Sequence, residues 1–451
     1  MGQFPSGPHC GSMGSLISPK GISVTAKSVL TGHLLALAAL LPAPALAQSA
    51  GSPFVDDAKA GGVLRSLYFR RDLPTNAVQE SWAAGGSLWG RTGYWRDTLM
   101  FGATVYGSGV LYGPDNRDGT LSLKPGQNSI AVLGEAYARI KAWDQTFTLY
   151  RQAIGTNPQK AEGVRGLQTD MNYLGSRDIR MVPLTYEAAM FGGQITPTLR
   201  YQAGYVDKVK DINSEKFVSM SRLAGVTTKD AGLWNAGLQW QPVKDLWVQG
   251  SYYQVEDTIR IAYTDVDWVN RISKESYWRL AAQYTDQRSD GANLLTGSQF
   301  KIWNTGVYGE YGWKWLTLYG AAGWTGDGAA IRNPYSYGPY YISQRIKVFS
   351  RAGEDALMNG STFNLAPLGL TGFSFDFNIA DGRHAIDSAT RAALPKWREY
   401  DYDLVYRFAK ESAVPGMRLR LRYGTVREDF GTRTDKTDDL RIDLNWGVSF
   451  N

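Results

Sequence analysis

The sequence has almost no cysteine and no long hydrophobic run beyond its N-terminal region. The single cysteine is Cys10, so the remainder of the chain has neither disulfides nor thiolate metal sites. No run of about 18 or more apolar residues occurs after Ala47, which excludes a protein that crosses a membrane with helices. Histidine is also scarce, because only His384 lies beyond the N-terminal region.

The first 47 residues have the features of a secretory signal. Lys20 and Lys27 precede a short apolar core, which ends in Ala45-Leu46-Ala47. This small-x-small pattern is one that signal peptidase can cleave. We therefore assign residues 1–47 to a removed signal peptide and residues 48–451 to the folded protein.

The charge of the chain is close to balanced. The formal net charge of +6 falls by two when the lysines of the signal peptide are removed, and the basic residues are dispersed along the chain. A nucleic-acid-binding protein would carry its basic residues in a patch or stripe. We therefore expect no nucleic-acid partner.

The sequence is rich in aromatic residues and glycine. Aromatics make up 13% of the chain, with 15 Trp and 26 Tyr, and there are 50 glycines, although the mean hydropathy is negative at −0.30. A transmembrane β-barrel has this composition, because every second side chain faces a wet lumen while Trp and Tyr gather at the membrane interfaces. For an exported chain, the composition favours such a barrel.

Alternation of apolar and polar residues recurs in segments of about ten residues, the length with which a tilted strand crosses the hydrocarbon. It is clearest in LRIDLNWGVSF at 440–450, and it recurs at 399–408 and 373–379. Segments 233–241 and 246–254 form a predicted hairpin with a short turn. These segments predict an all-β fold, a transmembrane antiparallel β-barrel.

Longer stretches rich in Gly, Asn, Asp and Pro separate the predicted strands, and we interpret them as extracellular loops. They are residues 112–129, 155–184, 208–231, 286–299 and 326–360. At roughly 20–24 residues per strand with its connection, the mature chain provides about 16–18 strands. A barrel of that width encloses a lumen rather than a packed interior, so its size favours transport.

The most distinctive local pattern is a row of three arginines at 418–422. In a strand, Arg418, Arg420 and Arg422 share one face, and Leu419 and Leu421 share the other. Leucines toward lipid place the arginines in the lumen, because an arginine at the bilayer midplane would cost about 2–4 kcal/mol. Arginines about 7 Å apart could pass a carboxylate from one guanidinium to the next.

The row has a simpler interpretation, in which its members are ordinary wall arginines paired with acidic neighbours. Asp401, Asp403 and Asp443 are candidates for that pairing. By the same alternation, Arg139 and Lys141 also face inward and could extend the row.

Several segments, taken in chain order, resemble the OprD family of outer-membrane porins. They are FVDDAKAGGVLRSLYFRRD at 54–72, WAAGGSLWGRTGYWRDTLMFGATVYG at 82–107, LGEAYARIK at 133–141, TLYRQ at 148–152, SRDIRMVPLTYEA at 176–188, YDYDLVYRF at 400–408 and MRLRLRYGTVRE at 417–428. The resemblance implies an 18-stranded barrel, monomeric or loosely trimeric, that passes small carboxylate-bearing solutes along a column of lumen-facing arginines and lysines.

The resemblance also implies further site residues. It implies that a loop at about 155–184 folds inward as a constriction, with Arg177, Asp178 and Arg180 as its candidate pore residues. The alternative is that these three residues only bind the loop to the wall. Arg151 matches the basic residue at the start of that loop. Because Arg151 shares its parity with outward-facing apolar residues, we expect it beyond the lipid zone or after a bulge.

We therefore expect an outer-membrane porin for passive uptake of small anionic or zwitterionic solutes. We expect contacts with outer-membrane lipid and the assembly machinery, and no catalysis, cofactor or metal. One alternative is a barrel hydrolase, for which only His384 could be a histidine base. Another is an exported carbohydrate-binding β-sandwich, which would not need a row of arginines.

Overall fold

The computed structural model describes residues 51–155, 173–176, 178–335 and 341–450; the predicted signal peptide lies outside the described residues. The strands are β1 (Lys59–Asp72), β2 (Val78–Arg91), β3 (Leu99–Tyr112), β4 (Ile130–Ala142), β5 (Gln145–Gln152), β6 (Thr185–Thr196), β7 (Leu199–Lys210), β8 (Phe217–Ser219), β9 (Leu233–Val243), β10 (Leu246–Val255), β11 (Ile259–Arg271), β12 (Ser276–Ser289), β13 (Lys301–Trp313), β14 (Leu316–Thr325), β15 (Asp355–Asn364), β16 (Phe373–Arg383), β17 (Lys396–Arg407), β18 (Arg418–Asp429) and β19 (Thr434–Phe450).

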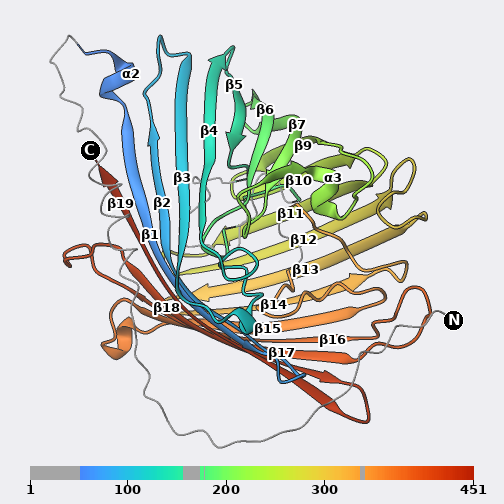
Figure 1. Cartoon of the computed structure of the whole chain (residues 1–451). Coiled ribbons are helices and arrows are strands. Elements are labelled where there is room, and N and C mark those ends of the chain that lie inside the picture. Colours follow the sequence, from blue (N-terminus) through green and yellow to red (C-terminus); the bar gives the residue numbers. More distant parts are fainter. Residues whose placement is uncertain (1–50, 156–172, 177, 336–340, 451) are drawn as a thin grey trace, which may run out of the picture. The chain divides into compact units, whose positions relative to one another are not determined.

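These strands close into a barrel. Each wall strand pairs antiparallel with its neighbour along the chain, and β1 pairs with β2 on one side and with β19 on the other (Figure 1). The short strand β8 pairs with β7, but β7 also pairs directly with β9, so β8 is not part of the wall. In the described part of the chain the wall therefore has 18 strands, which confirms the predicted fold.

Helices are few and short. The described residues contain α2 (Pro53–Asp56), α3 (Met220–Ala224) and the 3-10 turns η1 (Asp115–Arg117) and η2 (Ala366–Leu368). No helix within those ranges has the length and apolar character needed to cross a membrane.

The two faces of the wall differ as the sequence predicts. In β19, the inward-facing Arg441 is 5% exposed, whereas its neighbour Ile442 is 42% exposed. In β11, Ile261 is fully buried and Trp268, on the opposite face, is 43% exposed. Because successive side chains of a strand point to opposite faces, this alternation separates a lipid-facing surface from a lumen-facing surface.

The two ends of the barrel differ in their connections. Two-residue turns such as Trp143-Asp144 and Lys244-Asp245 lie at one end, and long connections lie at the other. Short turns are typical of the periplasmic end and long loops of the extracellular end. Four predicted loops were too long, because they include residue 112 of β3, 208–210 of β7, 286–289 of β12 and 355–360 of β15. The longest of these stretches, 355–360, alternates and pairs with β14.

Two segments of the extracellular connections pack inside the barrel. Tyr173 and Leu174, before β6, belong to a buried apolar cluster with lumen-facing residues of β10 and β11. Ile342 and Phe349, before β15, pack in a second buried cluster against β14, β15 and β16. These two inward segments, 173–184 and 341–354, narrow the lumen and shape the site.

Candidate functional site

A cavity of about 910 Å³ lies between the inward segments and strands β1, β17, β18 and β19, and we call it the arginine cavity. Nine arginines line it among the described residues, from both the wall and the inward segments. They are Arg65, Arg71, Arg180, Arg345, Arg407, Arg418, Arg420, Arg422 and Arg441. Four aspartates share the lining, namely Asp178, Asp401, Asp403 and Asp443. The cavity therefore presents an excess of positive charge.

All three arginines of the predicted row line this cavity, and all three have acidic partners. Arg420 Nη2 lies 2.6 Å from Asp403 Oδ2 and Arg422 Nε lies 3.0 Å from Asp403 Oδ1. Arg418 Nη2 lies 3.3 Å from Asp443 Oδ1. The Nε groups of Arg418 and Arg420 are buried without a hydrogen-bond partner among the described residues. These two arginines are thus ion-paired, and their side chains stay 32% and 25% exposed, so other guanidinium N–H groups remain accessible to a ligand.

The inward segment 173–184 brings two of its predicted residues to the same cavity. Asp178 accepts two hydrogen bonds from the guanidinium of Arg65 on β1. Arg180 Nε donates to the carbonyl of Thr120 at 2.9 Å. Arg177 lies outside the described residues. The ion pair between Arg65 and Asp178 fastens this segment to the wall, as sequence reasoning allowed.

Phe69 supports three of the arginines, and sequence reasoning did not identify it. It is 1% exposed on the inner face of β1. The guanidinium carbons of Arg71, Arg180 and Arg441 lie 5.3, 5.0 and 4.5 Å from its ring centroid. Arg71 and Arg441 also share the carboxylate of Asp439. Phe69 is two residues from Arg71 on β1 and therefore shares its face, and this alternation could have placed Phe69 in the lumen.

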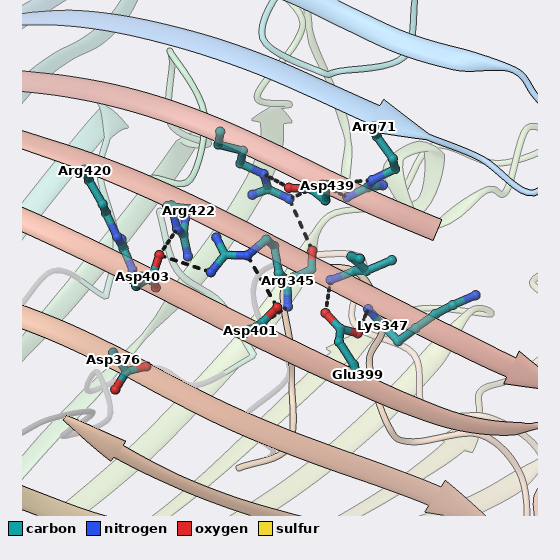
Figure 2. Close-up of polar contacts among 12 residues, drawn as sticks. Arg71, Arg345, Lys347, Asp376, Glu399, Asp401, Asp403, Arg420, Arg422 and Asp439 are labelled. Atoms are coloured by element: carbon teal, nitrogen blue, oxygen red, sulfur yellow. Dashed lines mark hydrogen bonds and ion pairs between the residues drawn. The ribbon is translucent and has the colours of Figure 1, made fainter. Parts of the chain in front are cut away.

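The second inward segment reaches the cavity through a tight turn at 343–348, which we call the loop tip. A bridge between Ser343 and Val348 closes the loop tip. The side chain of Arg345 is 1% exposed and lies 3.1 Å from Asp403 Oδ1 and 3.4 Å from Asp401 Oδ1. Figure 2 shows Arg345, Arg420 and Arg422 gathered around Asp403. Sequence reasoning placed this loop outside and missed Arg345.

Arg345 keeps its charge inside the barrel. Burial opposes the charged form, but the nearby carboxylates of Asp401, Asp403 and Asp439 outweigh burial and raise the pKa of Arg345 above its ordinary value. The loop tip therefore adds a permanent cation to the cavity.

Arg139 and Lys141 line a different cavity, which we call the turn-end cavity. It has a volume of about 1190 Å³ and is lined by the turns at 143–146 and 193–197. Arg139 Nε donates to Thr148 Oγ1 at 3.3 Å, and Lys141 Nζ lies 3.9 Å above the ring of Tyr94. Both side chains face the lumen, but they lie near the periplasmic end rather than beside the arginine row.

Arg151 lines neither cavity among the described residues. Its Nε lies 3.0 Å from Glu187 Oε1, and its guanidinium carbon lies 4.2 Å from the ring centroid of Phe217. The preceding Tyr150 has φ +78°, a conformation that interrupts the regular alternation of a strand. This residue does not form a bulge, because β5 pairs with β4 and β6 in unbroken register through Tyr150 and Arg151. Arg151 joins β5 to β6 and to the loop after β7.

The described residues contain little that is suited to catalysis or metal binding. His384, the candidate base, has a side chain that is 71% exposed and pairs with Asp355 at 2.7 Å. Within the described ranges, no three His, Cys, Asp or Glu side chains are grouped to hold a metal ion.

The comparisons with known proteins agree on one family. The sequence profile for outer membrane porins of the OprD family matches residues 162–450. The porin-like protein GalP of Pseudomonas putida is 22% identical over 449 residues, covering 92% of this chain and 96% of GalP. Pseudomonas aeruginosa OpdK, solved with vanillate, superimposes with a TM-score of 0.76 at 20% identity, covering 88% of this chain and 100% of OpdK. A BenF-like porin from Pseudomonas fluorescens Pf-5 gives a TM-score of 0.75 at 18% identity, with coverages of 88% and 100%.

The profile match spans more than half of the chain, and the solved structures share its fold. The closed barrel excludes the β-sandwich alternative, and the family consists of channels, which excludes the barrel hydrolase. The chain belongs to the OprD family of outer-membrane porins.

Proposed function

We propose that this porin mediates passive uptake of small carboxylate-bearing solutes, guided by the arginine cavity. The observation that carries the proposal is the lining of that cavity, where nine arginines face four aspartates. A guanidinium binds a carboxylate through two parallel, charge-assisted hydrogen bonds. A solute with a carboxylate therefore gains contacts in this cavity that a neutral or cationic solute of the same size does not gain.

The partial pairing of these arginines favours transit over tight capture. Arg418 and Arg420 each have an aspartate partner, while their side chains remain partly exposed to the cavity. A carboxylate can therefore exchange with an existing ion pair instead of meeting a bare cation. Conduction requires binding that is strong enough for entry and weak enough for release.

The other predicted site residues contact the solute at different points of its path in this proposal. Arg180 adds a cation from the inward segment, beside the pair of Asp178 with Arg65. Arg139 and Lys141 meet the solute later, in the turn-end cavity. A role for Arg151 or Arg177 in solute passage stays a prediction.

The chemical class of the solute draws support from a relative. OpdK has been solved with vanillate, an aromatic acid with one carboxylate. We infer that solutes of this chain are small acids of that general kind, either aromatic or cyclic acids or amino acids, because all of them present a carboxylate to the arginines.

Single-channel recording in planar bilayers tests the proposal with Arg420→Ala. Removing one cation from the lumen should lower the anion-to-cation permeability ratio roughly fivefold, which corresponds to a free energy of about 1 kcal/mol. Two charges about 4 Å apart interact by about 1 kcal/mol in water and by about 4 kcal/mol near a protein surface. Arg433→Ala is the matched control, since Arg433 has a side chain that is 67% exposed and pairs with Asp435 outside the arginine cavity. Equal selectivity in the two variants would refute the proposal.

A further inference from the structure

The carboxylates of β17 and the arginines of β18 do not all lie opposite one another. On the inner face of β17, Glu399, Asp401 and Asp403 follow one another at every second position, toward the periplasmic end. Asp403 is directly opposite Arg422 of β18, but Asp401 is opposite Gly424 and Glu399 is opposite Val426. Toward the extracellular end, the arginine row of β18 therefore ends before it reaches Asp401 and Glu399.

The other neighbouring strand does not supply the missing charge. On β16, the residue opposite Asp401 is Asn378 and the residue opposite Glu399 is Ala380. Two carboxylates on the lumen face thus have no cation directly opposite on either flanking strand. A buried carboxylate without a cation or hydrogen-bond donors is strongly unfavourable, so some other group must compensate both.

The loop tip provides that compensation. The backbone N–H of Arg345 donates to Asp401 Oδ2 at 3.1 Å, and its guanidinium approaches Asp401 and Asp403. The backbone N–H groups of Ile346 and Lys347 donate to the two oxygens of Glu399 at 2.7 and 2.8 Å. Figure 2 shows Asp401 and Glu399 to the right of Asp403, in contact with the loop tip.

The wall has space shaped for Arg345. A Cβ atom on Gly424 would lie 2.6 Å from Asp401 Oδ1 and 2.9 Å from Arg345 Cδ, which is too close for both. Gly250, on β10 and outside the arginine cavity, would place a Cβ atom 4.0 Å from its nearest neighbour, the carbonyl oxygen of Tyr263. The absence of a side chain at 424 is therefore what allows the guanidinium to approach β17.

We propose that Arg345 is the outermost step of the lumen's cationic row and sets the charge selectivity of the extracellular entrance. The wall supplies Arg418, Arg420 and Arg422, and the loop supplies the fourth step where the wall has Gly424. With the loop tip in place, the charge of Arg345 compensates Asp401, so the positive potential of the row continues to this level. Without the guanidinium, a carboxylate solute would meet the negative charge of Asp401. The inference rests on the proposed function of the arginine cavity.

Reversal potentials across a KCl gradient test this inference with Arg345→Gln in the full-length porin. The anion-to-cation permeability ratio should fall severalfold, and more than in Arg420→Ala, because Asp401 loses the guanidinium beside it, whereas Asp403 has more than one arginine partner. Arg391→Gln is the matched control, since Arg391 is an exposed loop arginine paired with Asp327. Adding Glu399→Gln and Asp401→Asn to Arg345→Gln should restore most of the selectivity.

A second pair of variants keeps every charge and covers the case in which Arg345→Gln does not assemble. Gly424→Ala should displace Arg345 and lower anion selectivity, whereas Gly250→Ala should leave it unchanged. The inference is overturned if Arg345→Gln behaves as Arg391→Gln, or if the two glycine variants are indistinguishable. The proposed function would survive either result as long as Arg420→Ala still lowers anion selectivity.

Discussion

Two parts of the inward segments, the apolar residues at the start of the first and the loop tip of the second, are held to different strands by different forces. Residues 173–184 pack into an apolar cluster with β6, β7, β10 and β11, in which Leu174 and Ile261 are fully buried. The loop tip, 343–348, is held at β17 and β18 by ion pairs and by N–H donors to carboxylates. Both segments narrow the same lumen. The loop tip places charged groups beside the path of a solute, as do Asp178 and Arg180 farther along the first segment.

This difference assigns separate tasks to the two sides. An apolar contact excludes water and has no preference for the charge of a passing solute. Guanidinium and carboxylate groups in a wet cavity interact with a solute over several ångströms. The apolar side therefore sets the width of the channel, and the ionic side sets its selectivity. Variants on the two sides should separate conductance from charge preference.

The largest effect is expected on the apolar side. Leu174→Ala removes a fully buried side chain from the inward segment, which should weaken its anchoring by about 2–5 kcal/mol. The segment should then leave the wall part of the time, so single-channel conductance rises and protease cleaves the segment in intact barrels. The permeability ratio should change little.

Leu419→Ala is the control for this variant, because Leu419 is 41% exposed on the outer face of β18. It should leave both readouts unchanged. A Leu174→Ala porin with normal conductance but altered charge selectivity would reverse the division of tasks between the two sides.

A smaller effect is expected at Phe69 on the ionic side. Phe69→Leu keeps an apolar side chain but removes the ring over which Arg71, Arg180 and Arg441 lie. Each contact between a cation and an aromatic face is worth about 0.5–2 kcal/mol. The arginines should become less fixed, which weakens carboxylate block of the current while the conductance stays near that of the wild type.

Phe377→Leu serves as the control, since Phe377 is on the outer face of β16 and stacks on Tyr402. If Phe69→Leu binds carboxylates as well as this control does, the ring of Phe69 has no role in fixing the arginines.

Alternation along strands was enough to predict most of the wall. It assigned Arg418, Arg420 and Arg422 to the lumen and Leu419 and Leu421 to lipid, because the period of a strand is two and the outer solvent is apolar. Each of these residues lies on the expected face. The closing strands could be predicted because lipid permits no long exception to the pattern.

Features that depend on position along the strand or on loop packing could not be predicted in this way. The alternation of the strand predicts that Arg139 faces the lumen, but it does not predict the position of Arg139 along the barrel axis. Arg139 lies in the turn-end cavity, near the turn at Trp143-Asp144. Arg345 is in a loop with no periodic pattern. Its position depends on Gly424 and on carboxylates more than 50 residues away in sequence, and no local rule connects them.

The most direct test of the account compares two solutes of one size that differ in charge. In liposomes containing the wild-type porin, an aromatic carboxylate should enter faster than the corresponding neutral amide, by severalfold at low salt. High salt should reduce the difference, because the Debye length falls from about 10 Å at 0.1 M to about 3 Å at 1 M. Equal rates for acid and amide at low salt would contradict the claim that the arginine cavity selects carboxylates.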